Sequence, residues 1–87
     1  MLGWVYIIES ESLGSYYLGS TNNLQRRLSE HNSGRVTATR NKGPWKLVFN
    51  QKFQTLQKAR KIEYKLKKMK SREILKKIIT ENKIRIN

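Results

Sequence analysis

The sequence predicts an α+β fold, in which a small three-stranded antiparallel sheet packs with three helices in the order β-β-α-β-α-α. Apolar runs typical of strands occupy 4–8, 16–18 and 45–50. Apolar residues recur at helical spacing within 24–32, 56–69 and 74–79. The first two strand-like runs are separated by a short turn containing Gly14, which favours antiparallel pairing. Together these observations indicate an α+β sandwich of a small antiparallel sheet and helices.

The first strand is expected at the centre of the sheet. Trp4, Tyr6 and Ile8 alternate with Val5 and Ile7, so both of its faces are apolar. A strand of this kind is covered on both sides. The second strand, residues 16–18, is short and is closed by Gly19.

A helix is predicted from N-cap candidates at 20–23 to about residue 32, with two leucines as its apolar line. Arg27 and His31 are four residues apart and are therefore neighbours beside that line. Arg27 is thus the arginine expected near the sheet, whereas Arg26 faces solvent.

Residues 34–44 form a polar, basic loop that is long for so small a domain, and long loops are often functional. In the strand that follows, the apolar residues Trp45, Leu47 and Phe49 alternate with three others. This alternation predicts a third strand.

The helix at 56–69, with Thr55 as its N-cap, carries one acidic residue, Glu63, among lysines and arginines. Glu63 lies on the side of the apolar stripe that runs from Leu56 to Met69, so its carboxylate points inward. An inward carboxylate is costly unless a cation meets it. Either it pairs with a lysine one turn away, or it is a metal ligand in a cleft.

Ser71 is expected to cap a last helix whose inward residues are Ile74, Leu75, Ile78 and Ile79. A chain of 87 residues makes one domain. We place that domain at 1–82 and a short tail at 83–87, in which 84–86 could form a marginal strand.

The charge is strongly unbalanced. Nineteen Lys and Arg face six acids, all glutamate, for a net charge of +13. A polyanionic partner explains this best, and nucleic acid is the commonest one. A basic helix could instead lie on an acidic membrane, but the stripe at 56–69 has no aromatic residue for the interface.

Other classes are excluded by composition. There is no cysteine, so disulfides, thiolate zinc sites and cysteine nucleophiles are ruled out. No apolar run reaches membrane-spanning length, and the apolar start lacks the basic leader of a signal peptide. We therefore expect a cytoplasmic protein.

Five residues form a set that phosphodiester hydrolysis can use: Tyr6, Tyr17, Arg27, His31 and Glu63. That reaction needs a base for water, a cation for the phosphate and a metal held by a carboxylate. Taken singly, each has a structural explanation. Because the chain has no aspartate and its other glutamates look exposed, we expect one metal ion.

Two short motifs resemble the paired motifs of the GIY-YIG nucleases, namely Val5-Tyr6 and Tyr17-Leu18-Gly19. The resemblance continues through Arg27 on the first helix, then Thr39-Arg40, and ends beyond the Glu63 helix, so it covers nearly the whole chain. It is strongest to small stand-alone bacterial members, which are related to the nuclease domain of the excision-repair incision subunit.

The resemblance implies roles for the five residues. Tyr6 would be the general base, Tyr17 a hydroxyl that orders water or phosphate, and Arg27 the phosphate clamp. His31 would assist proton movement or orient Tyr6. Glu63 would be the sole protein ligand of one Mg²⁺ or Mn²⁺ ion. Because free tyrosine has a pKa of about 10, the cations nearby would have to lower it.

The implied activity is metal-dependent hydrolysis of DNA in repair or processing, with a structure-selective or non-specific substrate preference. We expect nucleic-acid contacts from Arg27, Arg35, Arg40, Lys42 and Lys46. The chain departs from the family pattern in having Ala38 before Thr-Arg and Leu75 near the family's frequent asparagine. A non-catalytic basic nucleic-acid-binding module and a partner-docking subunit remain as alternatives.

Overall fold

The computed structural model describes residues 1–85. Its elements follow the predicted order: β1 (Gly3–Ser10), β2 (Tyr16–Thr21), α1 (Leu24–Asn32), the 3₁₀ turn η1 (Thr37–Thr39), β3 (Trp45–Phe53), α2 (Leu56–Met69) and α3 (Arg72–Glu81). The α+β prediction is therefore confirmed, and η1 adds one turn to the loop. Within the described residues, none of these helices is long and apolar enough to cross a membrane.

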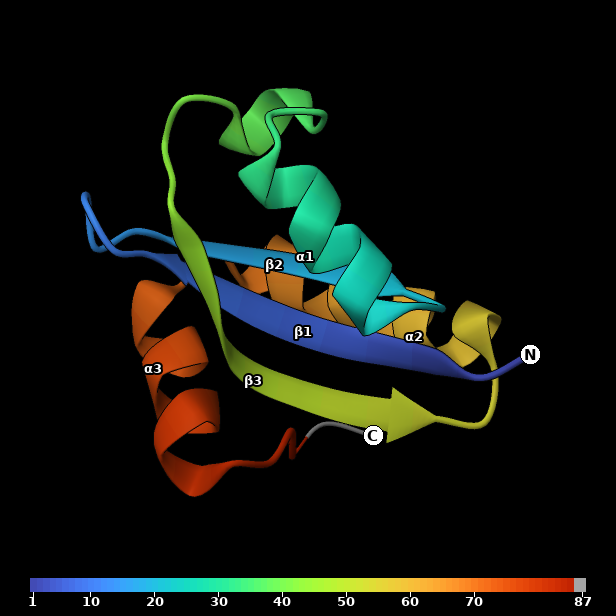
Figure 1. The fold of residues 1–87 in the computed structure, drawn as a ribbon. Helices are drawn as coiled ribbons and strands as arrows, with labels where there is room; N and C mark the ends of the chain where they lie inside the picture. The colour runs from blue at the N-terminus through green and yellow to red at the C-terminus, as the bar shows by residue number, and fades with distance from the viewer. Residues whose placement is uncertain (86–87) are drawn as a thin grey trace.

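The sheet has the strand order β2-β1-β3, and both pairings are antiparallel. Figure 1 shows α1 on one face of this sheet and α2 on the other. The central position predicted for β1 is confirmed. Its side chains alternate between the two layers, with Val5 and Ile7 in one core cluster and Tyr6 and Ile8 in the other.

The two clusters differ in what covers them. Val5 and Ile7 pack against Ala59, Ile62 and Leu66 of α2, which are all buried. On the other face, two leucines of α1 pack against the smaller cluster of Tyr6, Ile8 and Trp45. Because β1 presents Tyr6 to this second layer, the Tyr6 hydroxyl lies under α1.

The third strand is confirmed as β3, but its alternation is interrupted. Trp45 belongs to the α1-side cluster, but Phe49 belongs to the α2-side cluster, and Leu47 is exposed. The cause is an irregularity in register, since Ile7 pairs with Phe49 whereas Ile8 pairs with Leu47. The extra residue on β3 is Val48, and this bulge moves the side chains that follow it to the opposite face.

The helix starts follow their expected capping chemistry. Thr55 accepts a hydrogen bond from the backbone N–H of Lys58, and Ser71 accepts one from that of Ile74. Each cap satisfies an otherwise unpaired N–H group and contributes about 1 kcal/mol. At the other end of α2, Met69 was expected in the apolar stripe, but it is the last residue of the helix and is 45% exposed.

The segment predicted as a tail begins with an ordered contact. Ile84 is buried in the α2-side cluster, and its N–H donates to Oε1 of Gln51 over 3.0 Å. Residues 84–85 are not a strand. Ile86, the last residue of the strand considered there, lies outside the described residues.

Candidate active site

Tyr6 sits beneath α1 in a space left by a glycine. It pairs across the sheet with Gly19 of β2, and its side chain is 2% exposed. A β-carbon at position 19 would collide with the tyrosine ring, 2.6 Å from Cζ. Glycine is therefore required at position 19 for the ring and hydroxyl of Tyr6 to reach the site.

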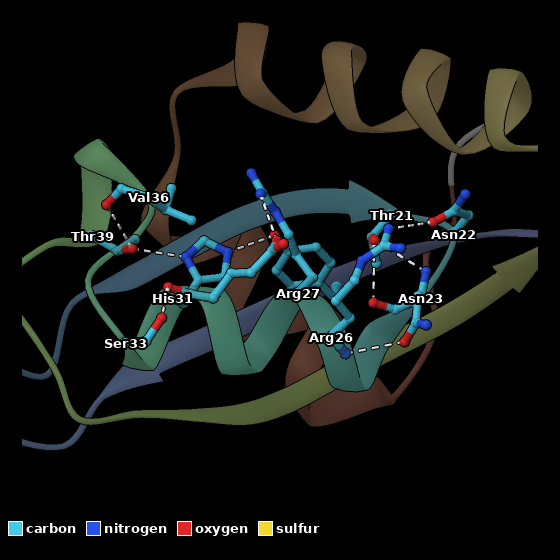
Figure 2. Close-up of polar contacts among 11 residues, drawn as sticks. Thr21, Asn22, Asn23, Arg26, Arg27, His31, Ser33, Val36 and Thr39 are labelled. Carbon is cyan, nitrogen blue, oxygen red and sulfur yellow. Dashed lines mark hydrogen bonds and ion pairs between the residues drawn. The ribbon is translucent and has the colours of Figure 1, made fainter.

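His31 connects that hydroxyl to the loop after α1. Its Nε2 lies 2.7 Å from the Tyr6 hydroxyl, and its Nδ1 lies 2.8 Å from Oγ1 of Thr39. Figure 2 shows the imidazole held between these contacts, with Thr39 on the loop side. His31 and Thr39 are both fully buried, so water does not compete for either ring nitrogen.

The partners of Thr39 bear on the tautomer of His31. The Thr39 hydroxyl lies 3.4 Å from the carbonyl oxygen of Val36, to which it can donate. We infer that its oxygen then accepts from Nδ1–H of His31, which leaves the lone pair on Nε2. That lone pair accepts the O–H of Tyr6. Thr39 was not among the site residues we predicted, and the Thr39-Arg40 motif was the one signal for it.

Burial sets the charge of both groups. Together with the positive charge of Arg27, it lowers the pKa of His31 to about 4. Burial likewise raises the pKa of Tyr6 to about 12, with smaller contributions from Tyr17 and Glu63, and it outweighs the hydrogen bond from Arg27. At neutral pH, Tyr6 is thus protonated and His31 neutral. Arg27 lowers the pKa of this tyrosine, as expected, but burial outweighs its effect. That Arg27 and a metal ion together bring the pKa below its free value stays a prediction.

Arg27 lies beside the Tyr6–His31 pair, and the neighbouring Arg26 is exposed, as expected. Arg27 Nη1 pairs with Oε1 of Glu30 at 3.0 Å, and the side chain is 36% exposed. Burial lowers the pKa of Arg27, but hydrogen bonds to Glu30 and Tyr6 outweigh it and raise the pKa. The guanidinium is therefore a permanent cation that reaches from the buried pair to solvent.

Glu63 reaches the same site from the opposite layer. It projects from α2 to the edge of β2, where the Ser20 hydroxyl donates to Oε1. Its Oε2 pairs with Nζ of Lys67 at 2.7 Å, and the Glu63 side chain is 17% exposed. The first of our two interpretations, a pair with a lysine one turn away, thus describes the contacts of Glu63. An inward carboxylate implies apolar surroundings. The Glu63 carboxylate lies instead at the edge of the sheet, beside the Ser20 hydroxyl.

Tyr17 joins the two halves of the site. Its ring centroid is 4.9 Å from that of His31, and Nζ of Lys67 lies 5.4 Å from the Tyr17 ring centroid. The five residues predicted from sequence are therefore brought together around the edge strand β2. Four of the predicted nucleic-acid contacts, Arg35, Arg40, Lys42 and Lys46, are exposed in or next to the loop that contains Thr39.

A family model described as the GIY-YIG catalytic domain matches residues 2–78. The chain belongs to the GIY-YIG family. Membership in this nuclease family supports an endonuclease-type activity and agrees with the resemblance of the two tyrosine motifs.

Relatives of this GIY-YIG chain occur in several bacteria. It is 39% identical to a UPF0213 protein of Clostridium perfringens, over 78% of this chain and 73% of the relative. It is 37% identical to a UPF0213 protein of Streptococcus pneumoniae, over 94% of this chain and 82% of the relative. The solution NMR structure of a UPF0213 protein from Bacillus halodurans has a TM-score of 0.57 and 34% identity, covering 92% of this chain and 84% of that one.

Nucleases of this family generally use a divalent metal ion. In this chain the candidate ligand is the carboxylate of Glu63. Within residues 1–85, no three His, Cys, Asp or Glu side chains come together. The Lys67 ammonium already bound to Glu63 indicates that this carboxylate accepts a cation. Because Mg²⁺ keeps several waters and needs only one or two carboxylates, the residues fit a single ion held by Glu63 in place of Lys67.

The neutral state of His31 can be tested directly, because it is the single histidine of the chain. In an NMR titration its ring signals should titrate well below the free value of about 6.5. Arg27→Gln should raise this pKa by removing the neighbouring charge, whereas Arg26→Gln, an equal charge change at an exposed position, should not. A wild-type midpoint at or above the free value, or equal shifts in both variants, would contradict the electrostatic account.

The same shift makes stability depend on pH. The folded state favours neutral His31, so its contribution is complete above the unfolded pKa of about 6.5 and is lost as the pH falls towards about 4. At about 1.4 kcal/mol per pKa unit, the free energy of unfolding should fall by about 2 kcal/mol between pH 7 and pH 5. Urea denaturation at the two pH values measures this change, and an increase would have the wrong sign.

Proposed function

We propose that this protein is a metal-dependent endonuclease that hydrolyses DNA phosphodiester bonds with one Mg²⁺ or Mn²⁺ ion, in DNA repair or processing. The observation that carries the proposal is the hydrogen bond of Tyr6 to the neutral Nε2 of His31, with the cationic Arg27 alongside. This arrangement supplies a proton acceptor and a phosphate-binding group within one site. The net charge of +13 favours a polyanionic substrate.

The proton path follows from the tautomer. Tyr6 is protonated, so it accepts a proton from water only as it passes its own to His31 Nε2. The imidazolium that forms is stabilised by its Nδ1–H bond to Thr39. His31 is thus the final base and Tyr6 the relay, which refines the role that the family resemblance implies for Tyr6.

The remaining residues bind and orient the substrate. Arg27 binds a non-bridging phosphate oxygen, and the Tyr17 hydroxyl orders the attacking water or the phosphate. Glu63 would hold the metal ion, which when bound supplies positive charge for the leaving oxygen. In-line attack by water would give a 5′-phosphate and a 3′-hydroxyl.

A non-catalytic nucleic-acid-binding module is the second candidate, and two contacts favour it. The Glu63 carboxylate is already satisfied by Lys67 and Ser20, as a structural ion pair would be. The Tyr6 side chain is almost inaccessible to solvent. Cleavage assays on plasmid and branched DNA with Mg²⁺ or Mn²⁺ separate the candidates, because the binding module predicts affinity without turnover.

Tyr6→Phe should abolish most turnover while keeping the fold. The substitution removes only the hydroxyl and keeps the ring that packs under α1. Acid–base catalysis contributes roughly 10²–10⁴-fold in rate, so single-turnover cleavage should fall by about that factor. Tyr64→Phe is the matched control, since Tyr64 is exposed on α2. Wild-type-like cleavage by Tyr6→Phe would remove this hydroxyl from the mechanism.

Glu63→Gln should abolish metal binding, which thermal unfolding can detect without any turnover. Mn²⁺ should stabilise the wild type by mass action but not the variant. Without metal the variant should lose less than about 1 kcal/mol, because Lys67 is 47% exposed and can be hydrated. Glu81→Gln is the control, because Glu81 likewise pairs with a lysine four residues away, Lys77, and also with Arg85. If Mn²⁺ stabilises all three proteins equally, Glu63 is structural.

A further inference from the structure

A cavity of about 370 Å³ opens where the start of β2 meets the junction of α2 and α3. Its lining includes Tyr16, Tyr17, Leu66, Lys67, Lys70 and Arg72. The candidate active site includes Tyr17 and Lys67 but none of the other residues that line the cavity. The cavity therefore adjoins the candidate active site and extends beyond it.

The walls combine aromatic, apolar and cationic groups. The Arg72 guanidinium carbon lies 4.3 Å from the centroid of the Tyr16 ring, and Arg72 Nη2 donates to the carbonyl oxygen of Gly14 over 2.9 Å. Two anchors thus hold this cation over an aromatic ring. Leu18 and Leu66 add buried apolar surface. Aromatic rings and arginine planes are the surfaces on which proteins stack unpaired bases.

Lys70 adds charge at a position that favours a different residue. It is the C-cap of α2 and has a left-handed backbone with φ 47°. Glycine or asparagine fits that conformation best, and a lysine there carries some strain. With Lys67 and Arg72, it places three cations around the cavity. This charge complements the phosphates of a nucleic-acid strand.

The cavity is connected to the candidate active site through two shared residues. Lys67 contacts Glu63 on one side and lines the cavity on the other. Tyr17 likewise contacts His31 and lines the cavity. A strand bound at the candidate active site would therefore meet the cavity along Tyr17 and Lys67. A paired base cannot enter, because it is stacked inside the duplex.

We propose that this cavity binds an unpaired nucleotide of the DNA substrate, with the base against Tyr16 and Arg72 and the phosphate near Lys70. The proposal rests on the proposed nuclease function and adds the substrate class to it. DNA with a single-stranded segment should therefore bind better than a continuous duplex of the same length.

The test is binding without catalysis. Fluorescence anisotropy in EDTA measures the affinity for a labelled single strand and for the matching duplex. Tyr16→Leu keeps apolar bulk and removes the stacking ring, so it should weaken single-strand binding about tenfold and duplex binding much less. Tyr64→Leu, at an exposed tyrosine outside the cavity, should change neither. Thermal unfolding checks that the Tyr16 variant is folded.

A second pair of variants tests the charge without touching the core. Lys70→Gln should weaken single-strand binding more than Lys76→Gln, which removes a charge that is also exposed, on α3 and outside the cavity. The proposal is overturned if the two lysine variants weaken binding equally and Tyr16→Leu lowers the affinity for the single strand and for the duplex by the same factor. Displacement of the strand by an equal concentration of free deoxynucleotide would also overturn it, because the cavity would then be a mononucleotide site.

These outcomes are separable from failure of the proposed function. If the wild type cleaves no DNA but the Tyr16 and Lys70 variants lose single-strand binding, the cavity assignment holds and the nuclease proposal fails. If the wild type cleaves DNA and neither cavity variant changes strand preference, the nuclease proposal holds and the cavity assignment fails.

Discussion

The hydrogen bond between the Tyr6 hydroxyl and Nε2 of His31 joins the central strand to the helix that covers it. Both groups are buried, so each needs a partner inside the protein. Their charge states follow from this requirement, because burial keeps Tyr6 protonated and His31 neutral. The bond also explains Gly19, since any side chain there would occupy the position of the tyrosine. Fold and candidate chemistry thus depend on the same contact.

The edge strand β2 lets residues from both layers meet in one site. Tyr17 and Gly19 face α1, whereas Ser20 faces α2 and donates to Glu63. This alternation follows from the two-residue period of a strand. Among the described residues, no strand pairs with the outer edge of β2. This edge is therefore open to a phosphate, with Arg27 on one side of it and Glu63 on the other.

Sequence was sufficient for the features set by local pattern. The apolar run of β1 predicted the central strand, and Thr55 and Ser71 predicted two helix starts, because each depends on neighbouring residues. The bulge at Val48 was missed, since an inserted residue looks like continued alternation. Thr39 illustrates a different limit, because what lies behind His31 is decided by packing between distant segments. The Lys67–Glu63 pair, by contrast, is local to one helix and was one of the two interpretations that the sequence left open.

The central claim is that His31 presents an unprotonated Nε2 to Tyr6, and the most direct test is its ring tautomer. ¹⁵N NMR of selectively labelled histidine distinguishes the two ring nitrogens at neutral pH, and the chain has one histidine to observe. The account predicts a proton on Nδ1, bonded to Thr39, and a free lone pair on Nε2. A proton on Nε2, or a doubly protonated ring, would contradict it, because His31 could then accept no proton from Tyr6.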